Sequence, residues 1–135
     1  MALNIEEEID QRITAMEAEP QASSGVDQVR REILFINDVI HTTGAESRGS
    51  VRSLAQIEVY GLATPSSTVC RGIIRFRPPS ELRPPYFKEA DQTIRLWLDI
   101  GHLGHVTTQL LHRKRFLWIG IWPDGYTYAD LHSRP

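Results

Sequence analysis

The feature that most constrains the fold is the regular alternation of apolar and polar residues in the last third of the chain. Every second position of the segment 93–100 is apolar: Ile94, Leu96, Leu98 and Ile100. This period of two is typical of a strand that is buried on one face. Further on, Pro123, Asp124 and Gly125 separate two aromatic runs with residues that favour a tight hairpin turn. The pattern predicts four short strands, at 93–100, 105–112, 115–122 and 126–132.

The second of these segments fits two structures. Leu103, Val106 and Leu110 have helical spacing, whereas Val106, Thr108 and Leu110 also alternate as they would in a strand. Three β-branched residues in a row and the even spacing of the neighbouring strands favour the strand.

Two more strands are predicted upstream, at 53–62 and 68–77. In the second, alternation assigns one set of residues to the core and the other to the opposite face: Cys70, Gly72, Ile74 and Phe76 against Arg71, Ile73, Arg75 and Arg77. A cysteine in an apolar core is usually inert. Two Arg-Pro-Pro units in 77–87 predict a stiff crossover around the sheet edge, with a docking loop or lid as the alternative.

The N-terminal region is predicted to form two helices. A thin apolar stripe with an acidic first turn indicates a helix at 3–18, and residues 19–25 have the composition of a linker. Apolar residues at helical spacing then predict a longer helix at 26–43, ended by Gly44.

Helices followed by strands indicate an α+β fold rather than alternating βαβ units. At 135 residues the chain has the length of one domain. We therefore expect a single domain, 1–135, with two N-terminal helices packed on an antiparallel, meander-type curved sheet of about six strands. Residues 1–20 would form an acidic helix that docks on this sheet or on a partner, and 26–135 would form the helix and sheet core.

The composition bears on location and partners. The lone Cys70 allows no intramolecular disulfide, the N-terminus lacks a signal-peptide pattern, and no apolar run would span a membrane. We expect a cytoplasmic protein without membrane contact. Residues 1–44 carry three Arg against nine acids, and 45–135 carry twelve Lys and Arg against eight. This asymmetry fits nucleic-acid binding by the basic part, or pairing of the acidic segment with its own basic sheet.

No motif assigns a catalytic residue or a cofactor. The sequence contains neither a Gly-x-Ser-x-Gly elbow nor a phosphate-binding glycine loop. Asp99, His102 and His105 are spaced three apart, so a metal site is an alternative if they converge on a turn.

Basic and aromatic residues alternate in the strands, which is typical of binding surfaces. The leading hypothesis is a non-enzymatic interaction protein, an adaptor, inhibitor or assembly factor, that acts as a homo-oligomer. Its partner-binding surface would combine Arg83, Tyr86, Phe87, Arg95, Trp97, Trp118 and Trp122. The first alternative is a nucleic-acid binder that uses Arg71, Arg75, Arg77, Arg113, Lys114 and Arg115. The second is a small-molecule binder or metal-dependent enzyme with a pocket lined by Trp and His.

Overall fold

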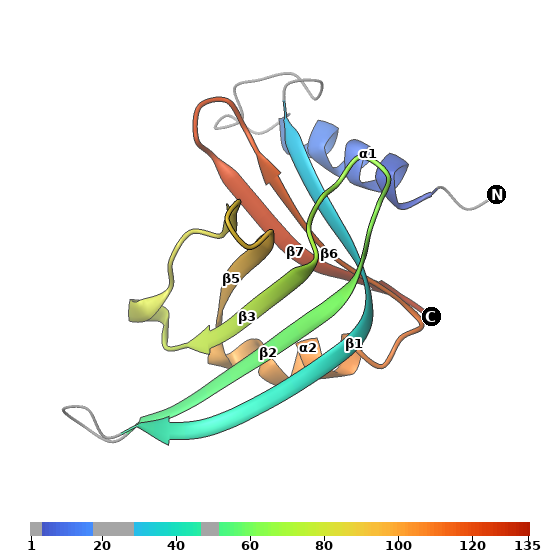
Figure 1. Ribbon diagram of the computed structural model, residues 1–135. Helices are drawn as coiled ribbons and strands as arrows, with labels where there is room; N and C mark the ends of the chain where they lie inside the picture. Colours follow the sequence, from blue (N-terminus) through green and yellow to red (C-terminus); the bar gives the residue numbers. More distant parts are fainter. Residues whose placement is uncertain (1–3, 18–28, 47–51) are drawn as a thin grey trace.

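The computed structural model describes residues 4–17, 29–46 and 52–135. Its centre is a strongly curled sheet of seven strands in the order β4-β5-β3-β2-β1-β6-β7 (Figure 1). The strands are β1 (Arg30–Glu46), β2 (Arg52–Ala63), β3 (Arg71–Arg77), β4 (Tyr86–Lys88), β5 (Thr93–Asp99), β6 (Lys114–Ile121) and β7 (Thr127–Arg134). The helices of the described residues are α1 (Ile5–Glu17) and α2 (Leu103–Gln109), with short 3₁₀ turns η2 (Pro79–Glu81) and η3 (Ile100–His102).

The predicted fold class is wrong. The sheet has seven strands rather than about six, and it is not a meander, because β3, β2 and β1 lie between β5 and β6. The first helix is present as α1, but the second predicted helix is a strand, and the sheet is mixed rather than antiparallel because β3 and β5 run parallel. The predicted linker, 19–25, lies outside the described residues.

The longest predicted helix, 26–43, is contradicted over its described residues, which form β1 from Arg30 onward. The first half of this strand is apolar on both faces, since Ile33 packs under α1 whereas Leu34 and Ile36 face the main core. A bulge at Asn37 then shifts the alternation by one residue. Together these features produce apolar spacings of three and four residues, which imitate the period of a helix.

The segment predicted as a strand at 105–112 is mostly the helix α2. Val106 and Leu110 are buried one turn apart, against the inner face of the sheet. Two of the three β-branched residues that argued for a strand, Thr107 and Thr108, form hydrogen bonds within the helix through their hydroxyl groups. Thr107 donates to the carbonyl of Leu103 at 2.8 Å, and Thr108 donates to that of Gly104 at 3.0 Å.

The Arg-Pro-Pro segment forms the crossover between the parallel strands β3 and β5. It passes through η2 and then adds β4 as a short edge strand antiparallel to β5. The curl of the sheet brings its two ends together. The Thr127 hydroxyl on β7 donates to the carbonyl of Pro85, just before β4, at 2.9 Å. The crossover therefore also closes the curl.

The sheet has an inner and an outer face. The inner face holds the larger core and is covered by α2, which lies behind β1 and β2 in Figure 1. On the outer face, α1 covers the end formed by β1 and β6 by packing Ile9 and Ile13 on Trp118 and Trp122. The outer face of β2, β3 and β5 has no helix over it in the described part of the chain.

Cys70 is exposed, which corrects its predicted place in the core. It precedes β3, so the alternation of the strand does not reach it, and Val69 is buried instead. No helix among the described residues is long and apolar enough to cross a membrane.

Candidate partner-binding surface

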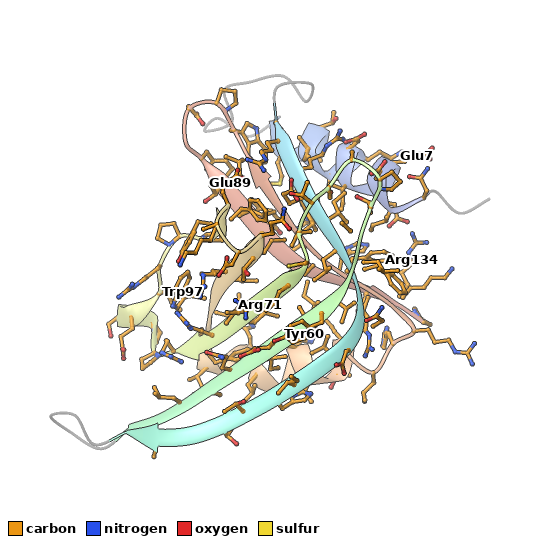
Figure 2. All side chains as sticks on the ribbon, in the orientation of Figure 1. Glu7, Tyr60, Arg71, Glu89, Trp97 and Arg134 are labelled. Carbon is orange, nitrogen blue, oxygen red and sulfur yellow. The ribbon has the colours of Figure 1, made fainter. Side chains whose placement is uncertain are left out.

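Arginine side chains and one tryptophan gather on the uncovered outer face. We call this surface the arginine–tryptophan face and define it by Arg75, Arg77, Arg83, Tyr86, Arg95 and Trp97. In Figure 2 the labelled side chains of Tyr60, Arg71 and Trp97 lie over the same part of the sheet, on the side away from α2. The face combines residues from the predicted protein-binding set with residues from the predicted nucleic-acid-binding set.

The strand registers explain why these residues meet. Arg75 and Arg77 are two residues apart on β3, so both point to the outer face. The parallel register places Trp97 of β5 directly beside Arg75. The crossover then brings Tyr86 of β4 opposite Arg95 of β5. Residues that are far apart in the chain thus form one surface.

Trp97 is the centre of the face and is only 8% exposed. Tyr86 stacks against it at 5.8 Å between ring centroids. The guanidinium groups of Arg75 and Arg83 lie 5.7 and 5.9 Å from the centre of the indole ring. These distances are typical of cation–π contacts, so Trp97 holds two cations on the surface.

The positive charges of the face are close enough to affect one another. Burial lowers the pKa of Arg75, and the nearby charges of Arg95, Arg77 and Arg83 lower it further. Asp91 neutralises the neighbouring end of the surface, since it pairs with Arg71 at 3.3 Å and with Arg95 at 3.2 Å.

A concave site lies at the other end of the face, between β3, Trp97 and the crossover. Its volume is about 460 Å³, and its lining residues are Arg75, Arg77, Ser80, Glu81, Leu82, Arg83 and Trp97. Three guanidinium groups around one hollow suit an anion, because each offers several fixed N–H donors. Glu81 also contributes a carboxylate to the rim.

The other predicted partner-binding aromatics lie elsewhere. Trp118 and Trp122 are on the outer face but are buried beneath α1, with 0% and 2% exposure. Phe87 is buried at 9% exposure, and the guanidinium of Arg30 lies over its ring at 5.1 Å. The tryptophan surface expected from the sequence is therefore not formed, because α1 covers Trp118 and Trp122 and the strands β3, β2 and β1 separate them from Trp97.

The predicted nucleic-acid-binding residues are separated into two groups. Arg71, Arg75 and Arg77 are on β3, whereas Arg113, Lys114 and Arg115 are at the start of β6, with β2 and β1 between the two strands. Arg115 also bonds to the main chain, where its Nε donates to the carbonyl of Ile36 at 3.2 Å and its Nη1 donates to that of Leu110. These six residues therefore do not form one continuous basic surface.

The predicted metal ligands are likewise not brought together. Asp99 is beside Arg77 in the register of β3 and β5, whereas His102 and His105 line a different cavity. Among the described residues, no three His, Cys, Asp or Glu side chains form a group that could hold a metal ion.

That second cavity, of about 480 Å³, lies between β5, α2 and β7. It contains three histidines, His102, His105 and His132, but no tryptophan. The pocket lined by Trp and His that the sequence suggested is thus represented only by its histidines.

The sequence interpretation missed Ser80 and Leu82, which form the crossover wall of the anion hollow. The only signal for them was their position between two Arg-Pro-Pro units.

Comparison of the chain with protein-family models, with curated proteins and with solved structures found no match.

Proposed function

We propose that this chain is a non-enzymatic binding protein that holds an acidic segment of a protein partner on its arginine–tryptophan face, and that it acts as a cytoplasmic homo-oligomer. The observation that carries the proposal is the convergence of Arg75, Arg77 and Arg83 on one hollow beside Trp97. Arginine stays protonated at neutral pH and binds carboxylates through paired N–H donors. The side chains of this face are thus suited to binding and orienting an anion.

The shape of the face favours a protein partner over a nucleic acid. Single-strand binders combine a long basic track with aromatic rings that are open for base stacking. Here the cluster is compact, and Tyr86 with two arginines covers the ring of Trp97. Tyr86 and Leu82 remain 43% and 42% exposed, which provides apolar contacts beside the anion hollow. An acidic peptide with neighbouring apolar residues matches this arrangement.

Fluorescence anisotropy with two labelled probes tests the proposal. One probe is a decapeptide of glutamate and leucine, and the other is an oligothymidylate of equal charge. We expect the wild-type protein to bind the peptide, and Arg75→Ala to weaken binding about 10- to 100-fold because a charge-assisted contact is lost. Arg113→Ala is the matched control, since it removes the same charge from an exposed position outside the face.

Equal loss of affinity in both variants would show that only net charge matters, and would contradict the proposal. Tighter binding of the oligothymidylate, with an affinity that falls steeply with salt, would replace the protein partner with nucleic acid. Binding of neither probe would also contradict the proposal.

A further inference from the structure

The two terminal strands of the sheet in the described residues, β4 and β7, have protected edges. The edge of β4 is only three residues long, follows Pro85 and contains Lys88. The edge of β7 carries Asp130 and Arg134, and Gln109 of α2 donates to the carbonyl of Leu131 at 3.2 Å. Short length, charge, proline and side-chain cover are the usual means of preventing edge pairing.

A further edge belongs to the second half of β1 and has fewer of these protections. Its one charged side chain within residues 37–45, Asp38, accepts the N–H of Val39 at 3.0 Å. β1 pairs with β2 as far as Glu46, but its pairing with β6 ends at Phe35. Arg115 caps the end of that second ladder through the carbonyl of Ile36. Beyond the bulge at Asn37, no strand of the described chain pairs with the backbone edge of β1 that lies opposite β2.

We call residues 37–45 the free β1 edge. Its sequence, NDVIHTTGA, contains no proline, lysine or arginine, and Asp38 is its one charged residue. Val, Ile and Thr favour strands, and Ile40 is 47% exposed. The unpaired N–H and C=O groups along the edge of such a segment can pair with another strand.

The free β1 edge is complementary to itself. Antiparallel pairing of two copies about His41 places Ile40 opposite Thr42 and Val39 opposite Thr43, which are favourable β-branched pairs. In the same register each Asp38 meets Gly44, so the two carboxylates stay apart. An edge with so few charges offers little to select a foreign peptide, whereas in its own copy each residue from 37 to 45 has a partner, with His41 opposite His41 at the axis.

We propose that two copies of this chain form a dimer by antiparallel pairing of residues 37–45 of β1 about a twofold axis at His41. The two curled sheets then join into one continuous sheet, with a backbone ladder as the main contact. This dimer specifies the homo-oligomer of the proposed function, but it uses a surface separate from the arginine–tryptophan face.

Hydrogen exchange of the wild-type protein tests the pairing directly. Light scattering should show a dimer at micromolar concentration. There we expect slow exchange at those amides of residues 37–45 that point away from β2. Dilution to monomer should accelerate these amides and leave those of β3 unchanged. A protein that stays monomeric at high micromolar concentration would overturn the proposal, and so would a dimer whose free β1 edge exchanges at the same rate as in the monomer.

A charge on the free β1 edge provides the second test. Thr42→Lys places two ammonium groups near the twofold axis, and we expect the dimer dissociation constant to rise at least tenfold. Ile100→Lys is the control, because it adds the same charge at a position that is 41% exposed directly after β5, and β3 and β2 lie between β5 and β1. Equal dimerisation of both variants would overturn the proposal.

Cross-linking tests the register. Because Cys70 is exposed, it must first be replaced in a Cys70→Ser background. His41→Cys in that background should then form an intermolecular disulfide under mild oxidation. A dimer that yields no such disulfide would overturn the His41 register.

The two proposals fail separately. Thr42→Lys should still bind the acidic decapeptide, and Arg75→Ala should remain dimeric. Loss of peptide binding in Arg75→Ala with an intact dimer concerns only the arginine–tryptophan face.

Discussion

The two ends of the outer sheet face bury tryptophan in different ways. Beneath α1, Trp118 and Trp122 are covered by the apolar side chains of Ile9 and Ile13. On the arginine–tryptophan face, Trp97 is covered by Tyr86 and by the side chains of Arg75 and Arg83. Both arrangements remove an indole ring from water, but only the second leaves charged groups at the surface.

The difference shows that burial alone does not distinguish a core residue from a residue of a binding surface. A helix that covers a ring excludes partners, whereas arginine stems cover a ring with their methylene groups and keep their charges in solvent. We therefore expect mutations beneath α1 to affect folding, and mutations around Trp97 to affect binding more than folding.

The largest expected effect comes from truncating the fully covered ring. Trp118→Ala should reduce the free energy of unfolding by about 3–5 kcal/mol, because it leaves a cavity in a closed core. Trp97→Ala should cost less, about 1–2 kcal/mol, because flexible arginine stems and water can fill the space. Denaturant unfolding of both variants measures the comparison. Equal losses would show that the two ends of the face are the same kind of core.

Truncating the helix side of the same contact should have the next largest effect. Ile13 is fully buried, and Ile13→Ala should cost about 2–3 kcal/mol by weakening the docking of α1. Because the docked helix shields Trp118 and Trp122, tryptophan fluorescence should also shift to longer wavelength. Gln11→Ala, at an exposed position of α1, is the control and should change neither property.

Removing a charge near Trp97 should scarcely affect stability. Arg75→Gln should change the free energy of unfolding by less than about 1 kcal/mol, since it removes a cation–π contact but also relieves repulsion. The lowered pKa of Arg75, caused by burial and then by Arg95, Arg77 and Arg83, indicates this repulsion. Added salt should stabilise the wild type more than the variant. The opposite order in thermal unfolding would contradict a repulsive cluster.

The smallest effect concerns the acidic end of α1 at low pH. The Ser66 hydroxyl donates to Glu6 at 2.7 Å, and this hydrogen bond lowers the pKa of Glu6 below its ordinary value of 4.5. The stabilisation is therefore complete above that value and is lost as the pH falls through the lower pKa of the folded state. Glu6→Gln should cost at most about 0.5 kcal/mol at neutral pH, because the group is largely solvated. Unfolding curves at pH 7 and pH 3 should differ less for the variant than for the wild type.

Local patterns in the sequence predicted several elements well. The strands near 53–62 and 93–100 and the hairpin turn before Gly125 are present, and the turn has the expected geometry. Gly125 has a φ of 92° and donates to the carbonyl of Trp122 at 3.0 Å. These elements are determined by residues close together in the chain, so alternation and turn chemistry are sufficient to find them.

Other elements depended on contacts that local patterns do not contain. The first half of β1 is buried on both faces because α1 covers one of them, and the bulge at Asn37 then shifts the alternation by one residue. The hydroxyl groups of Thr107 and Thr108 donate to carbonyls within α2. Val106 and Leu110 of the same segment pack in the core on the inner face of the sheet. In α2 tertiary burial overrode the local propensity, whereas in β1 the strand agrees with the propensity of Ile, Val and Thr and only the apolar spacing imitated a helix.

The candidate site shows the same division. The alternation of β3 by itself determined that Arg75 and Arg77 share a face, because successive side chains of a strand point to opposite sides. Only the tertiary structure decided that Trp97 lies beside them and that Trp118 does not belong to the same surface. The parallel pairing of β3 with β5 and the docking of α1 are long-range contacts, and they set which residues of a common pattern meet.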